Sequence, residues 1–174
     1  MWMSIALYLL SRFPEMWNVL SESELAAFIS AAKGLIERYV GGTVFRSVVT
    51  RKLFVSEGSI LVPTVKLNEV QNVQLLYPYD HLTINTQDLQ VFDNGLVVLP
   101  FPVTGYASVT YDAGYDEDEL PADLIEAAAQ ITYHIANLNP QLASATVGNV
   151  SMRFNENSIP SSAKEILDNY RLGL

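Results

Sequence analysis

Residues 43–111 carry one strand pattern after another, and a helical pattern lies on either side of them. The strand-like runs are short, rich in β-branched and aromatic residues, and bounded by glycine, proline and asparagine. Asn94-Gly95 between two such runs is a strong hairpin signal, because both residue types tolerate a positive φ. The sequence therefore predicts one antiparallel sheet of five to seven strands.

Two long amphipathic helices are expected at the borders of this region. The first begins at a capping box in residues 21–24 and carries apolar residues at a 3.6-residue period until Gly41-Gly42 stops it. The second begins at Pro121, a residue suited to the first position of a helix, and ends at residues 139–140.

A shorter helix is expected near each terminus, over residues 4–13 and 160–170. Together the elements predict an α+β fold. It would have two long packed helices, a short N-terminal and a C-terminal helix, and an antiparallel β-sheet inserted between the long helices. We expect a single domain at residues 1–140, with its β region at 43–112, followed by a C-terminal arm and helix at 141–174.

The composition fits a folded chain with apolar surface to spare. Of 174 residues, 49% are hydrophobic and 17% charged, and the mean hydropathy is +0.18. These values exclude a disordered chain. The length suits one domain with a core of its own. We expect the spare apolar surface to lie in contacts between subunits, and a large core is the alternative explanation of the composition.

The charge is acidic and unevenly distributed. The formal net charge is −9, and residues 57–152 hold twelve acidic residues against one basic residue, Lys66. Such a surface repels phosphate backbones, which excludes tight or sequence-specific nucleic-acid binding. A surface past which DNA slides without sticking is still compatible with this charge.

No residue pattern predicts a cofactor, a metal ion or a membrane span. The chain has no cysteine, which excludes disulfides, zinc–thiolate sites and thiol catalysis. His81 and His134 lack partners at metal-ligand spacing, and the sequence has no nucleophile elbow and no phosphate-binding loop. The N-terminal apolar run at residues 5–10 is too short to cross a bilayer.

Four consecutive acids, Asp116, Glu117, Asp118 and Glu119, precede the second long helix. Negative charge at a helix N-terminus is favoured by the helix dipole, so we interpret the run as a solvated helix entrance. An acid hydrolase built on these carboxylates is an alternative. It would need two carboxylates in separated environments facing a cleft.

A second alternative is a ligand- or carbohydrate-binding β-rich module. It would use Tyr77, Tyr79 and His81 as a stacking platform. Tyrosine at a strand end is more often a packing residue, which favours a structural role for this group.

Three short motifs mark the borders of the elements. The first long helix ends at E-x-Y-x-G in residues 37–41, and a strand region reads L-x-P…V-x-x-V in residues 61–73. The joint before the second long helix reads V-x-Y-x-A-G-Y…L-P-x-x-L in residues 109–124. In this order, residues 21–140 resemble a head–tail adaptor of tailed bacteriophages and gene-transfer-agent particles, also called a head–tail connector or head-completion protein. Lys66 departs from the pattern, because many members carry a second proline there.

The resemblance implies a structural virion protein with no enzymatic activity. Such proteins form a homo-oligomeric ring, usually of twelve subunits, at the neck of the particle. The ring connects the capsid portal to the tail or stopper and extends the DNA channel, so DNA passes through without specific binding. The implied partners are the portal protein and a stopper or tail-completion protein. The protein would be made in the bacterial host cytoplasm and would reside in the virion neck.

The C-terminal arm is the segment that the resemblance assigns to the portal or to a neighbouring subunit. Its basic residues are opposite in sign to the acidic body, and its last helix has an apolar face that needs a partner. The candidate interface residues are Arg153, Phe154, Ile159, Lys164, Ile166, Leu167, Tyr170 and Arg171. The acids at 116–119 are then candidates for channel-facing or solvated positions. Docking of the arm on its own subunit is the alternative.

Overall fold

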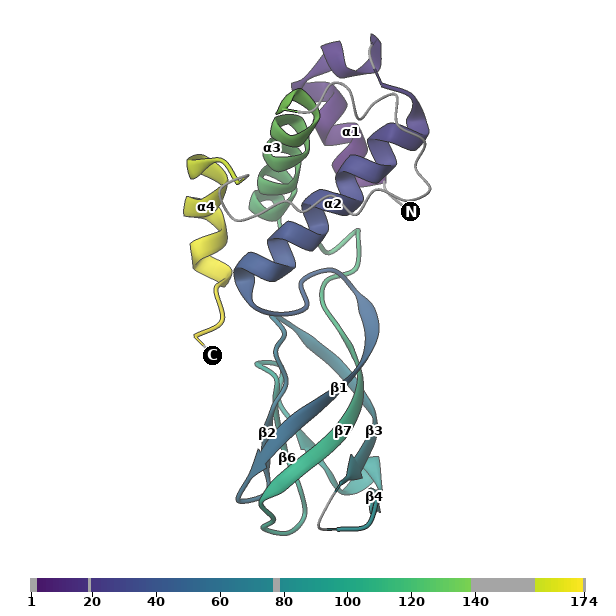
Figure 1. The fold of residues 1–174 in the computed structure, drawn as a ribbon, viewed down its shortest axis with the longest axis vertical. Coiled ribbons are helices and arrows are strands. Elements are labelled where there is room, and N and C mark those ends of the chain that lie inside the picture. Colours follow the sequence, from purple (N-terminus) through teal and green to yellow (C-terminus); the bar gives the residue numbers. More distant parts are fainter. Residues whose placement is uncertain (1–2, 19, 77–78, 139–158, 174) are drawn as a thin grey trace. The chain divides into compact units, whose positions relative to one another are not determined.

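The computed structural model describes residues 3–18, 20–76, 79–138 and 159–173. It contains two compact units (Figure 1). A helical unit comprises Met1–Val40 and Glu117–Arg171, and a sheet unit comprises Gly41–Asp116 and Leu172–Leu174. The expected domain boundary at residues 140–141 lies outside the described residues.

The helical unit has four α-helices among its described residues. They are α1 (Met3–Arg12), α2 (Glu22–Val40), α3 (Ala122–Leu138) and α4 (Ser161–Leu167), with 3-10 turns η1 (Pro14–Asn18) and η5 (Asp168–Tyr170). The predicted capping box opens α2. The Ser21 amide donates to Glu24 Oε2 at 2.8 Å, and the Glu24 amide donates to Ser21 Oγ at 3.4 Å.

Helix α3 is the centre of the helical unit and contacts α1, α2 and α4 (Figure 1). Its buried residues are not confined to one narrow stripe, since Ala127, Ala128 and Ala129 are all fully buried, as are Ile131 and Ile135. Alanine has no long side chain to hold neighbours away, so helices can approach α3 from more than one side.

The predicted arrangement of two long packed helices with a sheet inserted between them is wrong, although the fold is α+β overall. The long helices α2 and α3 contact each other, but they do so inside a four-helix group, and the strands form a separate unit with its own core. Helical periodicity identifies which residues are buried. It does not identify how many neighbours cover them.

In the part of the chain that the structure describes, the sheet unit forms one seven-stranded antiparallel sheet with the order β4-β3-β7-β1-β2-β6-β5. The strands are β1 (Ser47–Ser56), β2 (Ser59–Leu61), β3 (Leu67–Leu75), β4 (Thr83–Ile84), β5 (Gln90–Val91), β6 (Leu96–Val98) and β7 (Gly105–Ala113). A 3-10 turn, η2 (Thr86–Asp88), precedes β5.

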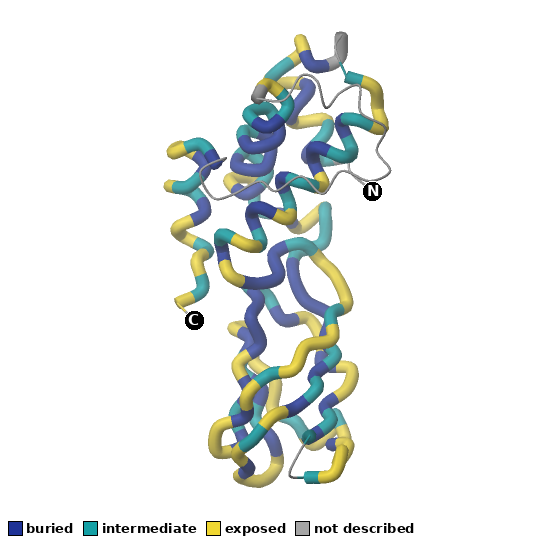
Figure 2. Tube along the Cα trace, in the orientation of Figure 1, coloured by how far each residue is buried: buried dark blue, intermediate teal, exposed yellow. Residues whose placement is uncertain are grey.

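Strand β7 pairs with β1 on one side and with β3 on the other, and the long strands β1 and β7 run side by side in Figure 1. Its alternate residues Ala107, Val109 and Tyr111 are fully buried, whereas Tyr106 is 47% exposed. In Figure 2 the buried residues of β7 are dark blue, and most residues between them are teal because they are partly exposed. One face of these strands therefore packs on the sheet core, and the other is left open.

The hairpin turn predicted at Asn94-Gly95 is present, and a second tight turn joins β1 to β2. Glu57 and Gly58 connect β1 to β2 with φ values of 50° and 80°. The turn between β5 and β6 is closed by the Gly95 amide, which donates to the Phe92 carbonyl at 3.0 Å, and Gly95 itself has a φ of 88°.

Candidate functional site

The most specific sequence motif, the A-G-Y of residues 113–115, forms a close backbone crossing in the sheet unit. Gly114 has a φ of +95°, and a Cβ atom built on it would lie 2.6 Å from the Phe45 carbonyl carbon. Its amide donates to the Lys66 carbonyl at 2.8 Å, and the next residue, Tyr115, bridges to Phe45. The backbone approach leaves no room for a side chain, which explains the glycine.

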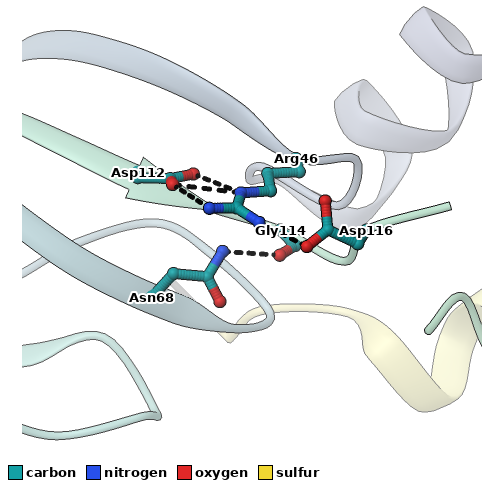
Figure 3. Close-up of polar contacts among 5 residues, drawn as sticks. All are labelled: Arg46, Asn68, Asp112, Gly114 and Asp116. Atoms are coloured by element: carbon teal, nitrogen blue, oxygen red, sulfur yellow. Dashed lines mark hydrogen bonds and ion pairs between the residues drawn. The ribbon is translucent and has the colours of Figure 1, made fainter. Parts of the chain in front are cut away.

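An arginine–carboxylate cluster lies beside this crossing (Figure 3). Arg46 Nη2 donates to Asp112 Oδ2 at 2.8 Å, and Arg46 Nε donates to both Asp112 oxygens at 3.2 and 3.0 Å. Arg46 Nη1 donates to Asp116 Oδ2. Asn68 Nδ2 adds a bond to the Gly114 carbonyl at 2.9 Å. One guanidinium thus connects the residue before β1 to the end of β7 and to the residues after it.

The cluster is suited to clamping the backbone. Hydrogen bonds to Asp112, and next to Asp116, raise the pKa of the Arg46 guanidinium above its ordinary value, so it stays cationic. The Asp112 side chain is only 11% exposed, while those of Arg46 and Asp116 are 46% and 42% exposed. Both carboxylates accept bonds from the same cation. They are not placed as an acid and a base across a cleft.

The four acids at 116–119 have different environments. Asp116 is bound to Arg46, and Glu117 Oε1 accepts the Ser4 amide at 3.0 Å within the helical unit. Asp118 and Glu119 are exposed. The interpretation as one solvated run therefore describes the last two residues better than the first two. None of the four lines the groove described next, so the hydrolase alternative gains no support.

A groove of about 370 Å³ opens in the helical unit between α1, α3 and the start of α4. It is lined by Arg12, Phe13, Glu126, Gln130, Tyr133, His134, Pro160 and Ser162. The rings of Phe13 and Tyr133 stack with centroids 4.0 Å apart.

A polar chain runs along this groove and connects the same three helices. Tyr8 Oη donates to Glu126 Oε2, Gln130 Nε2 donates to Glu126 Oε1 at 2.6 Å, and Ser162 Oγ donates to Gln130 Oε1 at 2.6 Å. The bond from Tyr8, followed by that from Gln130, lowers the pKa of the Glu126 carboxyl. The groups satisfy one another, and the chain links α1 and α4 to α3.

The candidate interface residues near the C-terminus divide into covered and uncovered ones. Ile159 and Leu167 are buried in the chain's own helical unit, at 4% and 0% exposure, where α4 contacts α3 and α2. Lys164 and Ile166 are partly exposed and Arg171 is exposed. Arg153 and Phe154 lie outside the described residues.

Three hydrogen bonds from two tyrosine hydroxyls tie the end of this segment to the long helices. Tyr170 Oη donates to both Asp123 oxygens at 2.8 and 2.9 Å, and Tyr39 Oη donates to Asp168 Oδ1 at 2.7 Å. The guanidinium of Arg171 lies 5.3 Å from the centre of the Tyr39 ring. These contacts anchor the last helix on its own chain.

The residues proposed for a ligand platform are not arranged as one. Tyr79 is partly buried against the sheet core, and its hydroxyl donates to the Thr104 carbonyl at 3.1 Å. His81 is exposed with a φ of 61°, and Tyr77 lies outside the described residues. The ring of Tyr79 is thus used for packing, as tyrosines at strand ends often are.

Two searches of the described residues add no site. No three histidine or acidic side chains gather there in a way that could hold a metal ion. None of the helices in this part of the chain combines the length and the apolar character needed to cross a membrane.

Sequence reasoning missed Arg46, Asp112, Tyr8 and Glu126 as structural contacts. Each bond joins residues far apart in the chain, and the pairing register that brings Arg46 beside Asp112 cannot be read from either segment alone. Two signals were available in the sequence for the first of these contacts: the basic residue Arg46 at the start of a strand, and Asp112 inside the V-x-Y-x-A-G-Y motif.

Comparison with known proteins gives the family. The model of the family described as head completion protein matches residues 14–172, which is most of the chain. The chain therefore belongs to the head completion protein family, and the identification made from the motifs is confirmed. No curated protein matches the chain.

The fold is similar to that of solved neck structures. A chain from "Neck of empty GTA particle computed with C6 symmetry" has a TM-score of 0.56 and 15% identity over 86% of this chain and 79% of that one. A chain from "Neck of native GTA particle computed with C12 symmetry" has a TM-score of 0.53 and 17% identity, over 92% and 90%. A chain from "Virion of native gene transfer agent (GTA) particle" has a TM-score of 0.54 and 16% identity, over 88% and 81%. At these identities the likeness concerns the fold.

Proposed function

We propose that this protein is a structural component of a virion neck, where copies of it form a ring that joins the capsid to the tail. The observation that carries the proposal is family membership over residues 14–172. The similarity of the fold to chains of necks solved with C12 and C6 symmetry supports a ring of six or twelve copies. Twelve copies is our proposal.

The role in the ring is one of connection. The portal protein is the partner on the capsid side, and a stopper or tail-completion protein is the partner on the tail side. DNA passes through the ring without specific binding, which fits the net charge of −9. No catalytic role is part of the proposal, since the strongest carboxylate cluster is closed by Arg46.

The C-terminal segment is the proposed contact with the portal or with a neighbouring copy. Its uncovered groups among the described residues are Lys164, Ile166 and the exposed Arg171, which also lies over the Tyr39 ring, because Ile159 and Leu167 are covered by the chain itself. Basic side chains at this surface suit an acidic partner and would fix the register of docking.

The proposal is tested by deleting the coding sequence in the particle-producing strain. We expect DNA-filled capsids and free tails that do not join, and joining restored by the wild-type chain. Imaging of restored particles should show density for this protein between portal and tail. Normal tailed particles after deletion, or density for the protein elsewhere, would contradict the proposal.

A further inference from the structure

Two exposed patches of opposite charge lie on separate parts of the sheet unit. The basic–aromatic patch consists of Lys52, Phe54 and Tyr106, on the open face of β1 and β7. The acidic–apolar edge consists of Asp88, Val91, Phe92 and Asp93, at and beside the edge strand β5. Each combines uncovered apolar surface with charge of one sign.

The basic–aromatic patch is an ordered cluster. Phe54 and Tyr106 are directly opposite each other in the β1–β7 ladder, with ring centroids 5.5 Å apart in an edge-to-face arrangement. Lys52 Nζ lies 4.6 Å from the centre of the Tyr106 ring. The two aromatic residues are nevertheless 55% and 47% exposed. Paired aromatic rings held in place and left in water are typical of contact sites.

This patch carries one of only four basic residues in the sequence of the sheet unit. Arg46 is bound to two carboxylates, and Lys66 lies over the ring of Tyr115. Arg51 and Lys52 are both exposed on β1. Successive strand residues point to opposite faces, so Lys52 supplies positive charge to the face that carries Phe54 and Tyr106.

The acidic–apolar edge is also held in a fixed conformation. Val91 and Phe92 are 41% and 47% exposed, and Asp88 and Asp93 are exposed beside them. The Phe92 amide donates to the Leu96 carbonyl at 2.9 Å, and the Asp93 carbonyl accepts the Leu67 amide at 3.1 Å. Among the described residues, strand β5 pairs only with β6. Strand β5 has only two residues, Gln90 and Val91, so the uncovered apolar surface at this edge comes from the side chains of Val91 and Phe92.

We propose that the basic–aromatic patch of one copy docks on the acidic–apolar edge of the next copy. The two patches are complementary in charge and both are apolar, yet β2 and β6 separate their strands and neither patch covers the other. A contact between two different patches is heterologous, and repetition of a heterologous contact generates a ring when its rotation closes. The inference rests on the proposed function, because it specifies the surface through which ring neighbours meet.

The absence of cysteine allows a clean crosslinking test. Lys52→Cys is mixed at high concentration with an affinity-tagged Asp93→Cys chain, and a short bismaleimide is added. Mass spectrometry then identifies the linked residues. We expect a linked heterodimer in several-fold excess over the control pair Arg51→Cys and Asp93→Cys. Position 51 is exposed on the same strand but faces the other way.

Two further measurements accompany the crosslinking. Phe54→Ala in the Lys52→Cys chain should reduce the linked product several-fold, and circular dichroism of this variant should remain unchanged. Equal yields for the test and control pairs would overturn the inference, even if the deletion experiment still placed the protein in the neck. If the two variants are linked selectively but imaging shows that the protein is absent from the neck, the proposed contact is supported and the proposed function is contradicted.

Discussion

Gly114 cannot be replaced by a larger residue without strain, because a side chain there would meet backbone atoms. Its φ of +95° is unfavourable for any other residue, and the Phe45 backbone lies 2.6 Å from the position of a Cβ atom. We expect Gly114→Ala to lower the free energy of unfolding by more than about 2 kcal/mol. Urea denaturation followed by circular dichroism measures this.

A matched control for that change is Gly34→Ala in α2. Nothing lies within 4 Å of a Cβ atom at Gly34, and the residue is exposed in a helix interior. The substitution should therefore stabilise the chain by about 0.5–1 kcal/mol. Equal effects of the two alanines would show that the crossing at Gly114 is not under steric constraint.

Asp112 and Asp116 share Arg46 but differ in exposure, at 11% and 42% for their side chains. Asp112 also accepts three of the four guanidinium bonds. We expect Asp112→Asn to lower the Tm by roughly 3 °C or more, and Asp116→Asn by less than about 2 °C, since exposed ion pairs stabilise little. Calorimetry of the two variants measures both changes in Tm. A larger loss from Asp116→Asn would contradict the clamp assigned to Asp112.

At the scale of elements, α1 is joined to α3 by a bond with a clear pH dependence. Donation from Tyr8, and next from Gln130, holds the pKa of Glu126 below its ordinary value of 4.5. A depressed carboxyl pKa stabilises the fold above the unfolded value, and this contribution is lost as pH falls through the folded value, below pH 4.5. Tyr8→Phe should raise the pKa of Glu126 towards its ordinary value, as measured by NMR titration of the side-chain carboxyl. An unchanged titration would rule out the bond as the cause.

Helix α4 is expected to be part of the helical unit's core. Leu167 is fully buried where α4 meets its neighbours, whereas Ile166 is partly exposed. Leu167→Ala should cost about 2–4 kcal/mol of unfolding free energy, and Ile166→Ala about 1 kcal/mol or less. Denaturation curves of the two variants test this. If Ile166→Ala were the more damaging change in the isolated chain, the assignment of the two faces of α4 would be wrong.

The local elements were predictable from the sequence because their signals are local. The capping box at Ser21 and the hairpin turn at Gly95 each depend on a few neighbouring residues. The grouping of the helices was not predictable, because α3 is covered from several sides by helices distant in sequence. The Arg46 cluster was missed for the same reason. Its register is set by the whole β1–β7 ladder.

At the scale of the whole chain, the point of interest is where the acidic residues and the exposed aromatic residues lie. Among the described acids, Asp118 and Glu119 are exposed, Glu24 caps α2, and Asp112 and Asp116 bind Arg46. The aromatic residues left exposed, such as Phe54 and Phe92, sit on ordered strands and turns with charge beside them. A chain that functions alone would gain solubility by covering or replacing them. Their retention on a defined surface fits a protein whose working form is an assembly.

The net charge leads to the last prediction, which concerns DNA. A protein that lines or borders a DNA channel must not hold the duplex, and a net charge of −9 provides repulsion at any moderate salt concentration. We expect no retention of duplex DNA in a gel-shift assay even at about 50 mM salt, where phosphate contacts are strongest. Replacing the exposed acids Asp118 and Glu119 by lysine should produce weak, salt-sensitive retention if this surface comes close to DNA. Tight binding by the wild-type chain, with an affinity that falls steeply as salt rises, would instead show a basic contact surface and contradict passive passage.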